Sequence, residues 1–324
     1  MARSLNAIQG VIEEELKVFE TRFREAMRSP VPLLDKITFY IVRRKGKQVR
    51  PMFVFLSAKL CGEVQDATYT AASLVELLHT ATLVHDDVVD DSFERRGFFS
   101  INALWKNKIA VLVGDYLFSQ GMLVALRNKQ YRLLEIVSDA VQAMSEGELL
   151  QIEKARRLDI EEGVYYEIIR QKTASLIASA CAVGAASATD DEAVIERMRL
   201  FGEKIGIAFQ IRDDLFDFGT DDVGKPLGID IKEKKMTLPL IYALKQADAA
   251  ERRRIIGLIR RHSEDPEKVR EVVEFVRGSG GLEYAQQAME EFRREAFVLL
   301  EAFPLNPVRQ SLEDLVGFVT ERTK

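Results

Sequence analysis

The sequence predicts an all-α protein that forms one large helical bundle. The eight prolines leave the long interval between Pro51 and Pro226 without any proline, and helix interiors exclude that residue. Within this interval apolar residues recur at the spacing of one helical face, and no stretch of useful length shows the alternation typical of a strand. The prediction is therefore a single domain over residues 1–324, without a linker.

The predicted helices follow one another along the chain. The first buries a stripe formed by Ile8, Val11, Ile12, Leu16, Phe19 and Phe23. The second begins after residues 47–50, with Pro51 in its first turn, where proline is tolerated. The remaining helices are expected at 71–91, 109–126, 131–155, 164–187 and 191–218. Breaks are expected at 96–97, 221–225 and 263–266.

Composition limits both the partners and the location of the protein. The 324 residues are 47% apolar, which allows a large core, and the formal net charge of −5 disfavours a nucleic-acid partner. Cys61 and Cys181 fit neither a disulfide framework nor a metal site, so they are expected to be buried thiols in a reducing cytoplasm. Acidic residues near the N-terminus interrupt the apolar run that a signal peptide needs.

No membrane-spanning helix is expected, because no stretch reaches about 18 uninterrupted apolar residues. The closest stretch, residues 173–188, is rich in Ser, Ala and Gly. It indicates a helix packed closely inside the bundle.

The most informative segment is 83–97, which contains Asp86, Asp87, Asp90 and Asp91. On a helix, Asp86 and Asp90 lie one turn apart on the same face, where like charges repel. The preceding residues are apolar and the first positive residue is Arg95. Hard carboxylate oxygens without soft ligands favour Mg²⁺ over zinc or copper.

A second acidic cluster, Asp213, Asp214 and Asp217, repeats the DDxxD spacing of Asp86, Asp87 and Asp90, again after an apolar helical segment. One such cluster is commonly a solvated helix end. Two that both end apolar helices indicate opposed carboxylate faces that bind several Mg²⁺ ions. Because Mg²⁺ takes few protein ligands and prefers phosphate oxygens for the rest, the implied substrate is a polyphosphate ester.

Basic residues flank both motifs. Residues 43–50 carry five cations and open a helix, a combination that binds anions. Two further runs follow the motifs: Arg95 and Arg96 after the first, and Lys225, Lys232, Lys234 and Lys235 after the second. Each run alone is commonly a solvated face. Beside both acidic motifs, the runs indicate a diphosphate clamp.

The sequence resembles the trans-isoprenyl diphosphate synthases, or polyprenyl synthetases, and most of all their long-chain members. The matching segments occur in family order: GKQVRP at 46–51, HTATLVHDDVVDDSFERRG at 79–97, VLVGDYLF at 111–118, QKTASL at 171–176, FQIRDDLFD at 209–217 and GKPLGIDIKEKKMTLP at 224–239. The resemblance implies the isoprenoid-synthase fold, with an active-site cavity between central helices. It also implies a Mg²⁺-dependent head-to-tail (1′–4) condensation of isopentenyl diphosphate with an allylic diphosphate.

The resemblance further implies roles for individual residues. Mg²⁺, as three ions with substrate bound, would be held by Asp86, Asp87, Asp90, Asp213, Asp214 and Asp217. The allylic diphosphate, of farnesyl or geranylgeranyl type, would be contacted by Arg95, Lys172, Lys225 and Lys235. Isopentenyl diphosphate would be bound by Lys47, Arg50, His79 and Arg96, with Phe209 near its isopentenyl group. Thr173 and Gln210 would face the forming carbocation. The implied catalytic set is Asp86, Asp87, Asp90, Lys172, Thr173, Gln210 and Asp213.

Product length in this family depends on the residue five positions before the first motif, which lines the tunnel for the growing chain. Here it is Ala81, followed by Thr82, with Leu78 and Leu74 deeper on the same stripe. Enzymes that make C15 or C20 products often carry an aromatic residue there. A small residue leaves the tunnel open and predicts a product of about C30 to C40. The alternative is that Ala81 only permits close helix packing.

The family resemblance also implies a homodimer, and the long product is expected to pass to a membrane. Three other functions stay open. Glu76 and His79 form one Glu-x-x-His pair of the di-iron type, but a second pair is missing. A terpene cyclase usually replaces the second aspartate motif with an Asn/Ser/Glu type, and a non-catalytic partner subunit typically loses one motif. This chain keeps both.

Overall fold

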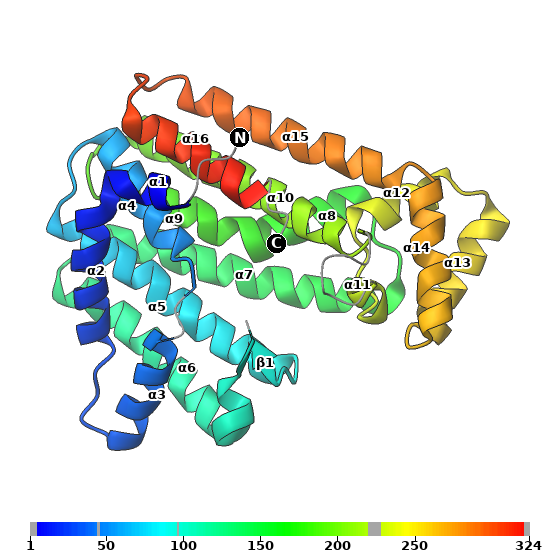
Figure 1. The fold of residues 1–324 in the computed structure, drawn as a ribbon, viewed down its shortest axis with the longest axis horizontal. Coiled ribbons are helices and arrows are strands. Elements are labelled where there is room, and N and C mark those ends of the chain that lie inside the picture. Colours follow the sequence, from blue (N-terminus) through cyan, green and yellow to red (C-terminus); the bar gives the residue numbers. More distant parts are fainter. Residues whose placement is uncertain (1–4, 44–45, 96, 220–227, 321–324) are drawn as a thin grey trace.

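The computed structural model describes residues 5–43, 46–95, 97–219 and 228–320, and nearly all of them are helical (Figure 1). The helices are α1 (Leu5–Gln9), the 3-10 turn η1 (Gly10–Ile12), α2 (Glu13–Ala26), α3 (Pro32–Arg43), α4 (Val49–Cys61), α5 (Asp66–Val89), α6 (Ile101–Arg127), α7 (Tyr131–Arg157), α8 (Glu162–Ile169), the π-helical turn η2 (Arg170–Ala174), α9 (Ser175–Ala186), α10 (Glu192–Phe216), α11 (Ile229–Lys232), α12 (Leu238–Gln246), α13 (Ala249–His262), α14 (Pro266–Gly278), α15 (Gly281–Leu300) and α16 (Pro307–Thr320). Strands β1 (Glu94–Arg95) and β2 (Phe98–Phe99) pair antiparallel in a short hairpin. The predicted all-α class is confirmed.

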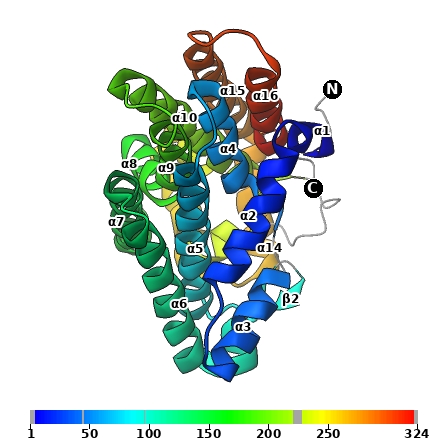
Figure 2. The same ribbon diagram turned by 90° about the vertical axis from the view of Figure 1, so that its left-hand side faces the viewer.

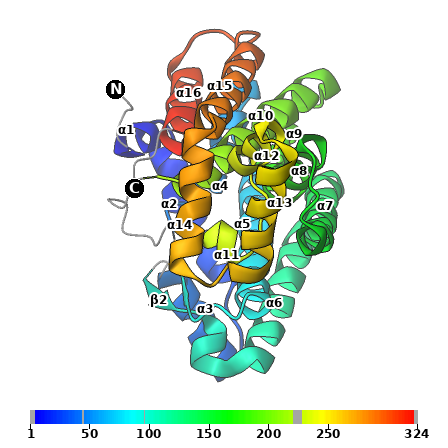
Figure 3. The same cartoon turned by 90° about the vertical axis from the view of Figure 1, so that its right-hand side faces the viewer.

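Helix α9 lies at the centre of the molecule and packs against α4, α5, α7 and α10. Outside this group, α6 covers α5 and α15 covers α10 (Figure 1). The hairpin, α3 and the beginning of α6 lie together at one edge, the lower one in Figure 2. Figure 3 views the molecule from the end where α11, α13 and α14 are gathered.

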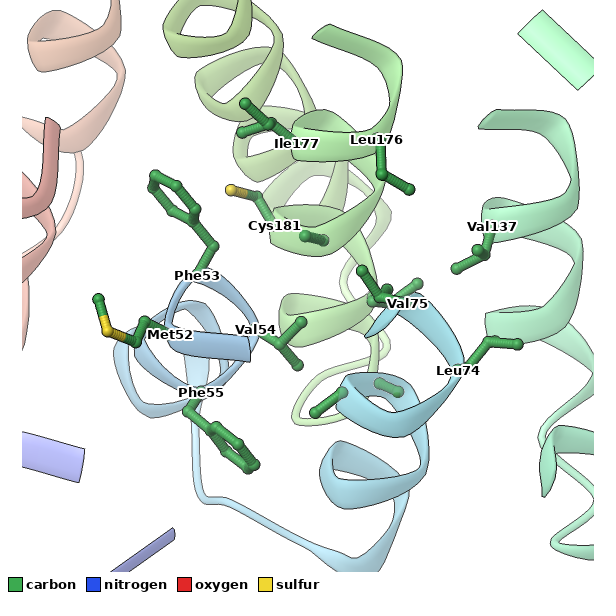
Figure 4. Packing of buried hydrophobic residues seen from close by; sticks show 14 of the residues in the cluster. Met52, Phe53, Val54, Phe55, Leu74, Val75, Val137, Leu176, Ile177 and Cys181 are labelled. Atoms are coloured by element: carbon green, nitrogen blue, oxygen red, sulfur yellow. The ribbon is translucent and has the colours of Figure 1, made fainter. Parts of the chain in front are cut away.

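The core around α9 is formed by large side chains from α4 and α5 that meet small ones from α9. Figure 4 shows Phe53 and Phe55 on α4, Val75 on α5 and Cys181 on α9 within this core, and all four are fully buried. The alanines, serines and glycine of α9 let its neighbours approach closely. The predicted closely packed helix is therefore confirmed, although its first residues belong to η2. Burial raises the pKa of both the Cys61 and the Cys181 thiol to about 12.

Two helices begin five residues or more before the start that the apolar periodicity predicts. Helix α5 begins at Asp66 rather than at residue 71, because Gln65 and Thr68 form a capping box at its N-terminus. Helix α6 begins at Ile101 rather than at residue 109, since the Ser100 hydroxyl accepts a hydrogen bond from the backbone N–H of Ala103. The sequence analysis did not weigh these polar caps.

Helix α6 differs from expectation in two further respects. The backbone of Lys106 is non-helical (φ 71°, ψ 161°), so a kink separates the first turn from the rest. By length and composition this helix could cross a bilayer, contrary to the expectation drawn from uninterrupted apolar runs, and a third of its most apolar window (33%) is buried. Part of its apolar surface packs on α5, and part is exposed.

Candidate active site

The first aspartate motif occupies the last turn of α5. Asp86 and Asp90 are exposed there, while Asp87 is buried with 4% of its surface accessible. The Asp87 carbonyl accepts hydrogen bonds from the Ser92 backbone N–H (2.9 Å) and from the buried Asn102 side chain (3.0 Å). These bonds fix the end of α5 against the beginning of α6. The two exposed carboxylates therefore stand one turn apart at a rigid helix end.

The second motif ends α10 in different surroundings. Asp213 is exposed, whereas Asp214 is 5% exposed. The carboxylate of Asp214 accepts hydrogen bonds from the Tyr165 hydroxyl (2.7 Å) and from the Gln210 amide (2.9 Å). Burial, with a smaller contribution from the nearby Asp230 charge, raises the pKa of Asp214 to about 7, although these two hydrogen bonds oppose the rise.

Asp217, the last residue of the second motif, caps a neighbouring helix. Its two carboxylate oxygens accept hydrogen bonds from the backbone N–H groups of Ile229 (2.7 Å) and Asp230 (3.2 Å), which open α11. Anionic groups stabilise helix N-termini in this way. Burial and then the Asp230 charge raise the pKa of Asp217 to about 6, against the effect of the two backbone hydrogen bonds. Asp217 thereby connects α10 to the segment that carries Lys235.

The π-helical turn η2 presents Lys172 and Thr173. The Thr173 hydroxyl donates to the Gln210 amide oxygen (2.7 Å), so that Gln210 links Thr173 to Asp214. Lys172 contacts Gln151 (3.2 Å) and Glu148 (2.5 Å) of α7. π-Helical turns occur frequently at functional sites.

Two glycines allow the helices on either side to approach η2. A Cβ at Gly147 of α7 would lie 2.8 Å from the backbone nitrogen of Lys172. A Cβ at Gly206 of α10 would lie 2.4 Å from the Cα of Ala174. Both distances are shorter than van der Waals contact, so only glycine permits this packing. The turn is therefore held tightly between α7 and α10.

Lys235 lies within electrostatic reach of both motifs. It forms ion pairs with Glu233 and with Asp230 (4.0 Å). Burial lowers its pKa, but the charges of Glu233, Asp230 and Asp90 outweigh burial, and the pKa is raised. Asp90 is among the charges that raise this pKa, and Figure 1 shows α5 ending on the side of the bundle where α11 lies. The two motifs therefore meet at the same end of the bundle.

A small cavity of about 90 Å³ lies beside the second motif, with Asp214 in its wall. Five residues from the predicted site line it together: Lys172, Thr173, Gln210, Asp214 and Lys235. These come from η2, α10 and the segment before α12, far apart in the sequence. The predicted cavity between central helices is thus present in the part of the chain that the structure describes.

A model of the family described as polyprenyl synthetase matches residues 31–276. The chain belongs to this family. It is 34% identical to the octaprenyl diphosphate synthase of Escherichia coli (strain K12), over 99% of this chain and 100% of that one. The family and this similarity make it a prenyltransferase of isoprenoid biosynthesis, which decides against the di-iron and terpene-cyclase alternatives.

Solved structures agree with this membership. A polyprenyl synthase from Caulobacter crescentus CB15, complexed with calcium and isoprenyl diphosphate, is 33% identical with a TM-score of 0.91 and covers 100% of this chain and 99% of its own. A geranylgeranyl pyrophosphate synthase from Bacteroides thetaiotaomicron is 38% identical with a TM-score of 0.83, and 98% of each chain is covered. Proteins similar to this chain are therefore named as synthases of long prenyl chains and as synthases of shorter ones.

The other predicted contacts lie just before α4 and on α4, α5 and α10. The Lys47 ammonium stands 4.9 Å from the centre of the Phe318 ring of α16, and Arg50 is half-buried in the first turn of α4. His79 is 8% exposed on α5, and Phe209 is half-buried on α10. None of these four lines the cavity beside Lys172. Arg96, Lys225 and the side chain of Arg95 lie outside the described residues, as does the break expected at 221–225.

The predicted chain-length residues lie along the buried side of α5. Ala81 and Leu74 are fully buried and Leu78 is 1% exposed, whereas Thr82 is half-buried and donates its hydroxyl to the His79 carbonyl (2.8 Å). Figure 4 shows Leu74 beside Val137 of α7. Leu74 is thus part of the packed core between α5 and α7. Whether Ala81 controls length or only allows packing stays a prediction.

The composition of the site suits a hard divalent cation that also binds substrate. All the candidate donors are carboxylates, and the described residues include no group of three His, Cys, Asp or Glu side chains close enough to hold an ion by themselves. Mg²⁺ typically takes one or two carboxylates and completes its shell with phosphate oxygens and water. Asp86 and Asp90, exposed one turn apart, fit that requirement.

The sequence analysis missed three residues of the site. Tyr165 bonds to Asp214, Glu148 pairs with Lys172, and Asp230 lies in the cavity wall beside Lys235. Tyr165 precedes Lys172 by two helical turns, a spacing that places both on one face, but no local motif marks it as functional. Glu148 and Asp230 become neighbours of the site only when the helices assemble.

Proposed function

We propose that this chain is an all-trans-polyprenyl diphosphate synthase that condenses isopentenyl diphosphate with an allylic diphosphate and makes a product of about C30 to C40. One observation carries this proposal. Two aspartate motifs end two helices at the same end of the bundle, and Lys172, Lys235 and the Thr173–Gln210 pair lie beside them. Carboxylates for metal, cations for diphosphate and neutral dipoles for a carbocation thus lie at one end of the bundle, where the cavity brings Lys172, Lys235, Thr173 and Gln210 together with Asp214.

Different residues of the site act on the metal, on the diphosphate and on the carbocation. Asp86, Asp90 and Asp213 would hold Mg²⁺, proposed as three ions with substrate, which would supply positive charge opposite the departing diphosphate. Lys172 and Lys235 bind diphosphate oxygens directly. As the allylic C1–O bond breaks, the oxygens of Thr173 and Gln210 face the developing positive charge. The double bond of isopentenyl diphosphate then supplies the electrons for the new C1–C4 bond, and its C2 loses a proton, with the released pyrophosphate as the proposed base.

The direct test is to incubate the purified protein with isopentenyl diphosphate and farnesyl diphosphate in Mg²⁺ buffer. We expect pyrophosphate release and, after phosphatase digestion, prenyl alcohols of about C30 to C40 by mass spectrometry. Excess EDTA should abolish turnover. A protein that binds both substrates without releasing pyrophosphate would instead be a non-catalytic subunit.

Product length has its own test at Ala81. Ala81→Tyr should shorten the product to about C15–C20, because a ring added to a packed helix face blocks the space beyond it. Thr80→Tyr, which adds the same ring at the half-buried neighbouring position on another face, is the matched control and should keep the long product. An unchanged length distribution for Ala81→Tyr would mean that the chain does not pass this residue.

We also propose that the protein is a cytoplasmic homodimer. The support is a set of exposed aliphatic side chains along α6, namely Val111, Leu112, Leu123 and Leu126, of which Leu112 has 57% of its surface accessible. Such a face is typical of an association surface. Analytical ultracentrifugation should give a dimer for the native chain and a monomer for Leu112→Glu with Leu123→Glu.

A further inference from the structure

The four phenylalanines that are exposed in the described part of the chain lie in one region. The chain has 18 phenylalanines, and the exposed ones are Phe39 (57%), Phe93 (70%), Phe98 (48%) and Phe99 (57%). Phe39 belongs to α3, and the others belong to the segment that follows the first aspartate motif and forms the hairpin. Large aromatic side chains that are exposed in an isolated chain often mark a surface that a binding partner covers. Their concentration therefore indicates an interaction surface.

A groove of about 450 Å³ runs through this region. One wall is a stripe of α3 at helical spacing: Lys36, Phe39, Tyr40 and Arg43. Phe98 of the hairpin and Trp105 of α6 form the other wall. We call these six residues the aromatic–basic groove. Both of its charged residues are cations, on a chain whose formal net charge is −5.

The groove is built by specific contacts. The Tyr40 hydroxyl donates to the Phe99 carbonyl (2.7 Å), and the Tyr40 and Trp105 rings meet edge to face at 5.2 Å between centroids. The Arg43 guanidinium lies 5.6 Å from the centre of the Phe39 ring. The kink at Lys106 separates the turn that carries Trp105 from the rest of α6. These contacts hold α3, the hairpin and the start of α6 as one surface (Figure 2).

We propose that the aromatic–basic groove and the adjoining Phe93 and Phe99 dock this protein on a bilayer that contains anionic lipids. Aromatic rings favour the boundary between headgroups and acyl chains, and flanking Lys and Arg side chains are attracted to anionic headgroups. The exposed face of α6 proposed for the dimer is aliphatic and lacks this composition. Two chemically different surfaces thus fit two different partners.

The position of the groove connects docking to catalysis. The hairpin begins four residues after Asp90, and the Ser100 hydroxyl at its far end donates to the Ser92 carbonyl (2.7 Å). The docked surface therefore adjoins the end of α5 where the diphosphate is held. This link rests on the proposed function, because only a long prenyl product would need delivery to lipid.

Vesicle co-sedimentation of the substrate-free native chain tests the docking itself. We expect binding to vesicles of phosphatidylcholine mixed with phosphatidylglycerol, weaker binding to phosphatidylcholine alone, and loss of binding as salt is raised. Phe39→Ser with Phe98→Ser should weaken binding at least about tenfold. Lys36→Glu should weaken binding only to the anionic vesicles.

The matched control is Val298→Ser with Leu305→Ser, which removes two apolar side chains at least as exposed (57% and 74%) as Phe39 and Phe98, far along the chain, and it should bind like the native protein. Circular dichroism establishes that every variant is folded. The proposal would be overturned if the native protein did not bind anionic vesicles, or if Phe39→Ser with Phe98→Ser bound them as tightly as the native protein. A change in the sedimentation mass of Phe39→Ser with Phe98→Ser without vesicles would also overturn it, because that result would assign the surface to self-association. Because no substrate is present, a failed docking test leaves the synthase proposal intact.

Discussion

The aspartates that end α5 and those that end α10 share one spacing but have different surroundings. Asp86 and Asp90 are exposed, whereas Asp214 and Asp217 accept hydrogen bonds through both of their oxygens from Tyr165, Gln210 and the opening backbone of α11. In the second motif only Asp213 is exposed. The same DDxxD spacing can therefore present carboxylates to a ligand, or it can present them to neighbouring helices as hydrogen-bond acceptors.

The difference suggests a division between binding and positioning. Carboxylates that already accept two protein hydrogen bonds are oriented, and moving them to a metal would cost those bonds. We infer that Asp86, Asp90 and Asp213 meet metal first, and that Asp214 and Asp217 hold η2 and α11 in place around it. Each of the following variants separates the two roles.

The largest effect is expected for Asp86→Ala. Turnover should fall at least about a hundredfold, because the departing diphosphate loses electrostatic stabilisation. The free energy of unfolding should stay equal or rise, since an exposed like charge beside Asp90 is removed. Steady-state kinetics and urea denaturation measure both quantities. Asp91→Asn is the control: Asp91 is exposed, lies outside the DDxxD spacing and has a left-handed backbone (φ 47°) that Asn tolerates. Comparable losses in both variants would contradict a specific role for Asp86.

A smaller effect is expected for Asp217→Ala. Loss of the cap should cost about 1 kcal/mol of stability and let the segment that carries Lys235 shift. The KM for the allylic diphosphate should then rise about tenfold, as in Lys235→Ala, where one charge-assisted contact is lost. The Mg²⁺ concentration for half-maximal rate should change little. If Asp217→Ala instead raises the Mg²⁺ requirement as strongly as Asp86→Ala, both motifs bind metal alike and the proposed division is wrong.

Tyr165→Phe should have a moderate effect, with kcat lowered about three- to tenfold, because Asp214 loses one of its two donors. The readout that separates positioning from metal binding is the Mg²⁺ titration by calorimetry in the presence of pyrophosphate, which should show metal binding close to that of the native protein. Tyr166→Phe is matched in chemistry and stands next in the helix, where its ring packs on Phe292. This control should leave both quantities unchanged.

The smallest effect is expected for the pH dependence of the stability of the metal-free protein. Burial raises the pKa of Asp214 to about 7, above its unfolded value of about 3.9. A raised pKa favours the protonated folded form, so this contribution to stability is complete below pH about 4 and is lost as pH rises through about 7. Urea denaturation in EDTA at pH 5 and pH 8 should therefore show a smaller decrease in stability for Asp214→Asn than for the native protein. Equal decreases would mean that Asp214 is not buried as a protonated acid.

The sequence alone determined the fold class and the location of both acidic clusters, because these depend on local features. Helical periodicity and the long interval without proline depend only on residues that are close in sequence. The DDxxD spacing likewise corresponds to one helical turn. Pro51 lies in the first turn of α4 as predicted. The close packing around the π-helical turn was not predictable in this way, since it depends on how closely Gly147 and Gly206 let α7 and α10 approach.

Only the tertiary structure decided which aspartates are exposed and which are buried or cap a neighbouring helix. Their sequence context is nearly the same, apolar helix before and polar segment after, but the surroundings come from other elements: Tyr165 from α8 for Asp214, and the N-terminus of α11 for Asp217. The aromatic–basic groove likewise joins α3 to residues about 60 positions later in the chain. Burial and hydrogen-bond partners are properties of the assembled helices, and no single segment contains them.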